Sequence, residues 1–170
     1  RGSAAAALAA LSVAGAMPAA GAEGARIHLG EAVTLGQGMA RTMVVENAAG
    51  KPATVAVLMS EAALAGLPKG SGHGHEAFTY VLPMPADGPK TGYDHAMLDW
   101  NPSGHVPDGV YSVPHFDVHF YLIDNATREL ITFKGDAAAE AAKAPAVDLL
   151  PAGYVAPPET AIEKMGIHGL

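Results

Sequence analysis

The segment 115–123 constrains the fold of this chain most, because its side chains alternate between two chemical kinds. The polar set, which would share one side of a strand, is His115, Asp117, His119 and Tyr121. The apolar set, which would share the other side, is Phe116, Val118, Phe120 and Leu122. Alternation with a period of two, carried by aromatic and β-branched residues, predicts a β-strand with one polar and one apolar face.

Other short strand patterns, separated by turn residues, precede and follow this segment. Strands are expected at 25–35, 39–46, 52–59, 76–84, 93–100 and 129–133. The second and third of these flank a glycine-containing loop, which predicts a hairpin. Several short strands between turn signals indicate an antiparallel β-sandwich or barrel.

Two short helices are expected among these strands. One covers 60–67, where Ser60 suits the N-cap position, and the other covers 136–144, which is rich in Ala, Glu and Lys. The segment 145–158 is rich in proline, which fixes the backbone and removes hydrogen-bond donors, so an extended arm is expected there. The fold class is therefore mainly β, with one or two short helices.

Residues 1–22 differ in composition from the rest of the chain. An apolar run from Ala4 to Ala16 is followed by Pro18 and by a small-residue site at 20–22. The run has about 13 residues, too few for a membrane span of about 20, and is typical of a secretory signal peptide. Because Arg1 is the only positive charge before it, we expect this peptide to be partial.

We expect residues 23–170 to form a single domain. With no second long apolar run, we expect a soluble protein of the periplasm or the exterior of the cell, without a membrane span.

Charge and cysteine content exclude several classes of function. Lys and Arg number 10 against 17 Asp and Glu, a formal net charge of -7, which argues against binding to nucleic acid. The absence of cysteine excludes disulfides, thiol catalysis and cysteine-based metal sites. Eight histidines and the carboxylates remain as metal ligands. No nucleophile elbow, phosphate loop or dinucleotide motif identifies a reaction, so whether the protein is an enzyme stays open.

The strongest candidate metal ligands lie on the polar side of 115–123. Residues two apart on a strand lie about 6.6 Å apart along the chain, and residues four apart about 13 Å. A metal ion bound at about 2.1 Å would therefore use His115 with Asp117, or Asp117 with His119, and would not reach both histidines without a bulge.

Further ligands are expected from neighbouring segments. His95 and Asp99 share one face of 93–100, and His105 lies in the loop that follows. The ligand set is thus His115, Asp117, His119, His95 and His105, with His73, His75, Asp99 and His168 as secondary candidates. Ligands of this kind suit a divalent transition metal, namely Zn, Cu, Ni, Mn or Fe. If the site is catalytic, a metal-bound water would be the reactive group.

Two other interpretations of the polar face are open. In the first, the protein is a non-catalytic structural or oligomer-forming envelope protein, and its His and Asp side chains form a hydrogen-bond network. In the second, Tyr93, Trp100 and Tyr121 surround a small ligand, whose identity the sequence does not indicate.

Several motifs resemble an exported bacterial family classed as a domain of unknown function. They are Pro114-His-Phe-Asp-Val-His-Phe-Tyr121, Tyr93-Asp-His95, Asp99-Trp-Asn-Pro-x-Gly-His105, Ser60-Glu-Ala-Ala-Leu-x-Gly-Leu-Pro68 and Leu149-Leu-Pro-Ala-Gly-Tyr154. The resemblance covers about 26–168 and implies the compartment and the domain, not an activity. It also implies a further aromatic segment after Met165-Gly-x-His168, where this sequence has Gly169 and Leu170, so we expect either a chain truncated at its C-terminus or a short variant.

Overall fold

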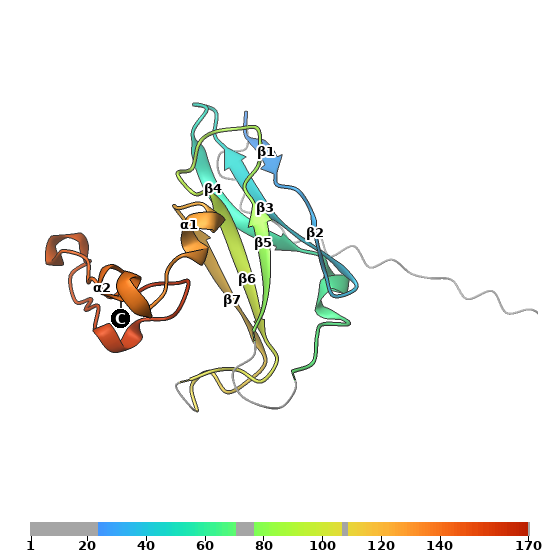
Figure 1. Ribbon diagram of the computed structural model, residues 1–170. Helices are drawn as coiled ribbons and strands as arrows, with labels where there is room; N and C mark the ends of the chain where they lie inside the picture. The colour runs from blue at the N-terminus through green and yellow to red at the C-terminus, as the bar shows by residue number, and fades with distance from the viewer. Residues whose placement is uncertain (1–23, 71–76, 107–108, 170) are drawn as a thin grey trace, which may run out of the picture.

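The computed structural model describes residues 24–70, 77–106 and 109–169, and it is built from two antiparallel sheets and several short helices (Figure 1). The expected leader at 1–22, together with His73 and His75, lies outside the described residues. In the described part of the chain, no helix combines the length and the apolar character needed to cross a bilayer.

The first sheet is organised around the long strand β3 (Gly38–Glu46). It pairs antiparallel with β1 (Arg26–Leu29), β2 (Val33–Leu35) and β4 (Pro52–Met59). The hairpin predicted between 39–46 and 52–59 is therefore confirmed. Strands β1 and β2 pair with different halves of β3, which leaves β4 alone on the opposite edge.

The second sheet carries the polar face predicted from the sequence. Its central strand β6 (His95–Asn101) lies between β5 (Phe78–Pro83) and β7 (His115–Tyr121), and both pairs are antiparallel. In the β6 and β7 pair, Asp99 stands opposite Asp117 and Met97 opposite His119. The odd-numbered residues of β6 and β7 thus share one face, as the alternation predicts.

The apolar core lies between the two sheets. Its fully buried members are Leu35, Ala40, Ala63, Leu82, Ala96 and Leu98. From β7, Phe116 and Phe120 pack against this cluster, whereas Val118 is half exposed because β7 is an edge strand. The polar face of β6 and β7 consequently turns away from the core. The described strands form a two-layer sandwich and not a closed barrel.

One predicted element has a different structure. The segment 129–133 was expected to form a strand, but it begins as the end of helix α1 (Asn125–Glu129) and then runs as irregular chain. The Asp124 carboxylate accepts a hydrogen bond from the backbone N–H of Thr127 at 2.7 Å, which caps the helix and directs the chain out of the sheet.

The helix expected at 60–67 is shorter than predicted. It is a single 3-10 turn, η1 (Glu61–Leu64), with Ser60 at the N-cap position but without a hydrogen bond from the Ser60 side chain to the turn. The Ser60 hydroxyl instead accepts a hydrogen bond from the backbone N–H of Met39 at 3.1 Å. This contact joins the turn to the start of β3.

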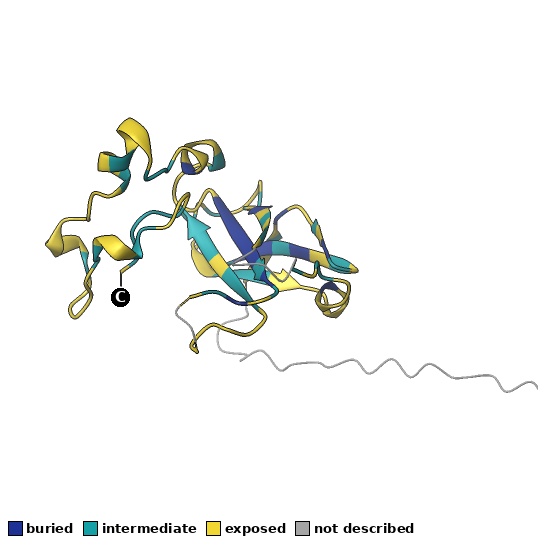
Figure 2. Ribbon diagram, turned by 60° about the horizontal axis from the view of Figure 1, so that its bottom comes forward, coloured by how far each residue is buried: buried dark blue, intermediate teal, exposed yellow. Residues whose placement is uncertain are grey.

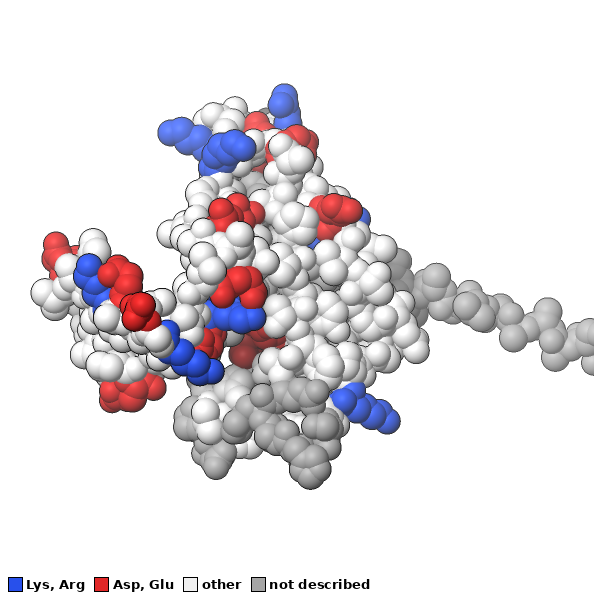
Figure 3. All heavy atoms as spheres, in the orientation of Figure 1, with Lys and Arg blue, Asp and Glu red and all other residues white. Residues whose placement is uncertain are grey.

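The segment after α1 lies to one side of the sheets, and most of it is exposed (Figures 1 and 2). It contains η2 (Gly135–Ala137), α2 (Ala138–Ala141), η3 (Val147–Leu149) and η4 (Pro158–Thr160). The helix expected at 136–144 is therefore present in a shorter form, and the proline-rich arm 145–158 contains one 3-10 turn. Lys and Arg side chains lie scattered among acidic ones on the face shown in Figure 3.

Candidate metal centre

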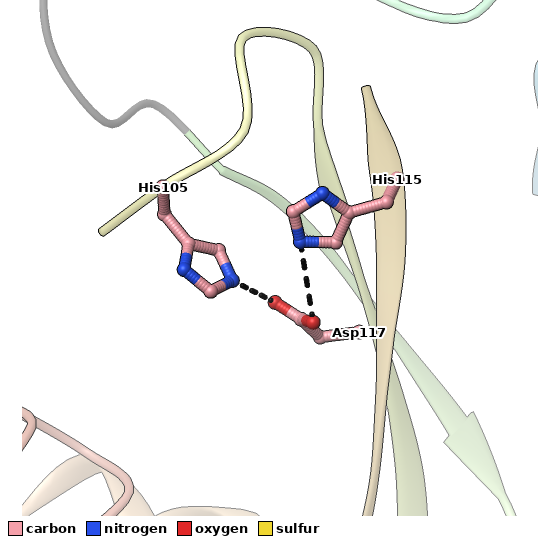
Figure 4. A group of neighbouring side chains, drawn as sticks. All are labelled: His105, His115 and Asp117. Atoms are coloured by element: carbon pink, nitrogen blue, oxygen red, sulfur yellow. Dashed lines mark hydrogen bonds and ion pairs between the residues drawn. The ribbon is translucent and has the colours of Figure 1, made fainter. Parts of the chain in front are cut away.

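Three of the predicted ligands meet at the end of the second sheet, and we call them the His/Asp triad: His105, His115 and Asp117 (Figure 4). Nε2 of His105 lies 3.0 Å from Oδ2 of Asp117, and Nε2 of His115 lies 3.5 Å from Oδ1 of the same carboxylate. One ligand atom from each residue lies within 4.8 Å of the other two. The three side chains can therefore contact one small ion.

Strand β7 supplies two members of the triad, and the loop after β6 supplies the third. His115 and Asp117 are two residues apart and so share a face of β7. His105 is held by the hydrogen bond from its backbone N–H to the carbonyl of Tyr111, at 2.9 Å. The preceding Gly104 has φ 71°, and a Cβ there would lie 2.0 Å from the Tyr111 carbonyl oxygen. Only glycine permits this close approach, which brings His105 over the sheet.

The hydrogen bonds of the two imidazoles determine which ring nitrogen faces Asp117. Nδ1 of His105 lies 2.7 Å from the carbonyl oxygen of Val106, and Nδ1 of His115 lies 2.6 Å from that of Val113. A carbonyl oxygen only accepts, so each Nδ1 carries a proton and donates. In the neutral imidazole, the lone pair is then on Nε2, the atom directed at Asp117.

A buried asparagine fixes the Asp117 carboxylate. Nδ2 of Asn101 donates to Oδ2 of Asp117 at 2.9 Å and to the backbone carbonyl of Asp99 at 3.1 Å. Asn101 is 5% exposed and stands opposite His115 in the β6 and β7 pair. In the described part of the chain, Asp117 forms ion pairs with the two triad histidines and with no Lys or Arg. Among the described residues, no Lys or Arg therefore balances its charge.

The triad is accessible to solvent. Its side chains are 28%, 21% and 33% exposed for His105, His115 and Asp117. Nε2 of His115 is itself buried and has no hydrogen-bond partner. Three protein ligands with partly exposed side chains resemble a catalytic zinc site, which keeps one position for water, more than a closed structural site with four.

The other predicted ligands do not join the triad. Nδ1 of His119 lies 3.4 Å from Oδ2 of Asp99, and Nδ1 of His95 lies 2.9 Å from Oδ1 of Asp94. The His95 ring also stacks on Tyr121, with ring centroids 5.0 Å apart. The ligands expected to form a single centre therefore lie at separate places along the sheet face.

His168 lies near His119 and is not part of the triad. Its Nδ1 lies 2.9 Å from the backbone carbonyl oxygen of Thr160. Together with Met165 and Ile167 it lines a groove that runs along β7, past His119 and Tyr121. It is a neighbour of the second group of ligands, not of the triad.

Trp100 does not lie on the polar face, contrary to the small-ligand interpretation. Its ring packs 4.8 Å from that of Phe116, and its indole N–H donates to the carbonyl of Pro68 at 2.9 Å. Because Trp100 is an even-numbered residue of β6, it belongs to the side of the sheet that faces the core.

A further histidine site, at His28, was not among the candidates expected from the sequence. Nε2 of His28 lies 2.8 Å from Oε2 of Glu46, and Nδ1 lies 3.0 Å from Oδ2 of Asp87. Hydrogen bonds to Asp87 and then to Glu46 raise the pKa of His28 above its ordinary value. The same contact with His28 lowers the pKa of Asp87. No local signal links these residues, since 59 positions separate His28 from Asp87.

Comparison with known proteins identifies a family model but no activity. Residues 47–100 match the model described as TTHB210-like: Hypothetical protein TTHB210. The match covers β4 to Trp100 in β6, so it includes Asp99 and ends before the triad. A search of the curated proteins found no match, and neither did a search of the solved structures. These findings support a domain of unknown function.

Proposed function

We propose that the protein binds a divalent transition metal ion through Nε2 of His105, Nε2 of His115 and the carboxylate of Asp117. One observation carries the proposal. Two imidazoles, each with Nδ1 hydrogen-bonded to a backbone carbonyl, direct their Nε2 atoms at the same carboxylate. Imidazoles that bind metals commonly have this second hydrogen bond, which sets the tautomer and the ring orientation.

A cation resolves the electrostatic conflict within the triad. A lone pair on Nε2 and a carboxylate oxygen are both acceptors, and they repel each other at short distance. Two ligand atoms on one tetrahedral metal ion, each at about 2.1 Å, lie about 3.4 Å apart. The observed separations of 3.0 and 3.5 Å are close to that value.

The ligand set narrows the metal and its chemistry. Two imidazole nitrogens and one carboxylate oxygen suit Zn, Cu(II), Ni, Mn or Fe(II) more than Ca or Mg, which prefer oxygen. A bound metal with a free coordination position lowers the pKa of water and provides a nucleophile. The solvent access of the triad supports this use, and no described residue identifies a substrate.

We also propose that the protein works after export, in the periplasm or outside the cell. The composition of residues 1–22 supports this proposal. Fractionation of cells that produce the full-length precursor tests it, since retention of the protein in the cytoplasm would contradict export.

Metal analysis of untagged protein tests the metal proposal. The protein is dialysed against Zn²⁺, and bound zinc is measured by mass spectrometry for the wild type, His115→Gln and Asp117→Asn. We expect each variant to lose about one equivalent relative to the wild type. His28→Gln is the matched control, because it removes an imidazole that lies outside the triad and should keep all the zinc. Equal zinc content in all four proteins would overturn the proposal.

A second candidate function uses the same side chains as a hydrogen-bond network. It is favoured by the Asn101 bonds and by the 3.0 Å contact of His105 with Asp117, which is also a hydrogen-bond distance when the imidazole is protonated. In this case the protein would be a structural or oligomer-forming component of the envelope. Its size by light scattering and its thermal unfolding would then be the same with and without EDTA.

A further inference from the structure

The polar face of the second sheet holds another carboxylate and imidazole beside the triad. Asp99 on β6 and His119 on β7 are diagonal neighbours, because Asp99 stands opposite Asp117 and His119 opposite Met97. Neither residue takes part in the triad. We call these two residues the pair. The atoms that face each other, Oδ2 of Asp99 and Nδ1 of His119, are both buried.

Asp99 is a buried carboxylate with one oxygen unused. The residue is 3% exposed, and its Oδ1 accepts a hydrogen bond from the Thr79 hydroxyl at 2.5 Å. Its Oδ2 is buried and has no hydrogen-bond partner. In the described part of the chain, its ion pairing is limited to His119. Burying a carboxylate oxygen without a partner is costly, so a group that fills this position stabilises the fold.

His119 faces the unused oxygen without bonding to it. Its Nδ1 is buried, lacks a hydrogen-bond partner and lies 3.4 Å from Oδ2 of Asp99. This separation is longer than an ordinary hydrogen bond and equals that of two ligand atoms on one metal ion, about 3.4 Å. The His119 side chain as a whole is 27% exposed and lines the groove along β7. The buried atoms of the pair therefore lie beside this groove.

The surroundings of the pair favour a cation. The Tyr121 hydroxyl, two residues beyond His119 on the same face, is buried and also lacks a partner. Asp99 and Asp117 are directly opposed across two strands, and like charges in this arrangement repel. No Lys or Arg of the described residues forms an ion pair with either carboxylate. The guanidinium of Arg128 lies 5.5 Å from the centre of the Tyr121 ring and pairs with Glu129, not with Asp99.

We propose that Asp99 and His119 form a second site for a divalent transition metal ion, next to the triad and separate from it. Oδ2 of Asp99 and Nδ1 of His119 are its protein ligands, and water from the groove along β7 completes the coordination. With two protein ligands instead of three, this site binds more weakly than the triad and fills after it. The proposal uses residues outside the triad, so it stands or falls independently of the first site.

Zinc titration of the full chain tests the second site. Untagged protein is freed of metal and titrated with Zn²⁺ by isothermal calorimetry, and bound zinc is counted after dialysis. The wild type should bind about two ions per chain in two steps. His119→Gln and Asp99→Asn should each remove the weaker step and keep the tighter one, whereas His115→Gln should remove the tighter step. Circular dichroism spectra identify variants that do not fold.

The outcomes separate the two sites. A wild type that binds a single zinc ion, and keeps it in His119→Gln and Asp99→Asn, overturns the second site, whereas a single ion that is lost in these variants supports it. Two ions that persist in both His119→Gln and Asp99→Asn also overturn it. Loss of the weaker step in these variants, with no loss in His115→Gln, supports the second site and overturns the first.

Discussion

Two regions of this molecule combine histidine with carboxylate in opposite proportions. At the edge of the first sheet, one imidazole, His28, lies between two carboxylates, Glu46 and Asp87. At the end of the second sheet, two imidazoles, His105 and His115, surround one carboxylate, Asp117. Both regions lie in the same sandwich, so the difference comes from the hydrogen bonds of the ring nitrogens.

The comparison separates a site that favours a proton from one whose geometry could hold a metal ion. Both nitrogens of His28 face carboxylates, and both can donate only when the ring is protonated, which is why its pKa is raised. In the triad, each Nδ1 donates to a backbone carbonyl, so the Nε2 atoms of the neutral rings have lone pairs that could bind a shared ion. The same residue types therefore serve different chemistry.

The largest effect is expected when the shared carboxylate of the triad is removed. Asp117→Asn should weaken zinc binding at the triad by more than about 100-fold, since loss of a second-shell partner alone costs 10 to 100-fold. Glu46→Gln, which removes a carboxylate from the His28 region, should leave zinc affinity unchanged. Calorimetric titration of both variants measures the difference, and a similar loss in the two would contradict the comparison.

Metal binding should also stabilise the fold. At a zinc concentration about one hundred times Kd, a site that exists only in the folded state adds about 2.7 kcal/mol to the free energy of unfolding. Urea unfolding with and without zinc should show this gain in the wild type and in His28→Gln. The gain should be much reduced in His115→Gln, and an undiminished gain there would show that zinc stabilises through other residues.

A smaller effect is expected from the residue that fixes Asp117. Asn101→Ala removes the hydrogen bond to the carboxylate but keeps all three ligands, so zinc affinity should fall by about tenfold. Because Asn101 is buried, the folded fraction is checked by circular dichroism. If folded Asn101→Ala bound zinc as tightly as the wild type, the hydrogen bond from Asn101 would not be needed to position the Asp117 carboxylate.

The smallest effect, and the one with a distinct pH dependence, belongs to His28. Its pKa is raised from 6.5 in the folded state, so its contribution to stability is fully present below that value and is lost as pH rises through the folded pKa. His28→Gln should therefore be less stable than the wild type at about pH 5.5 and equally stable at about pH 9. Urea unfolding at both values tests this, and a constant difference would contradict it.

Zinc binding should respond to pH in the other direction. Protons compete with the metal for imidazole, so affinity falls as the solution becomes acidic. A pH series on one protein preparation thus compares the two regions directly: the His28 contribution increases toward low pH, while zinc affinity decreases.

Much of the second sheet could be predicted from the sequence. The alternation of 115–123 is sufficient to place His115, Asp117 and His119 on one face of a strand. The strand spacing also implied that His115 and His119 would not share an ion. In the structure, His115 lies beside Asp117, whereas His119 lies beside a different carboxylate, that of Asp99.

Features that depend on the backbone of loops could not be predicted. The Asp124 side chain caps helix α1 just before 129–133, where a strand was expected. A local hydrogen bond outweighs strand propensity there. His105 joins the triad only because its loop folds closely against Tyr111. The contact between His28 and Asp87 joins segments far apart in the chain, and no periodic pattern marks it.

The close approach at Gly104 has a consequence for inheritance. If a larger residue replaced this glycine, the loop would move away from Tyr111 and carry His105 with it, while β7 and its His115 and Asp117 would stay in place. Sequences that descend from such a chain would keep the sandwich. Selection would no longer maintain the displaced histidine, so other residues would replace it. Gly104 and His105 should therefore be retained or lost together among related sequences. An alignment of these sequences would show which of them keep the third member of the triad.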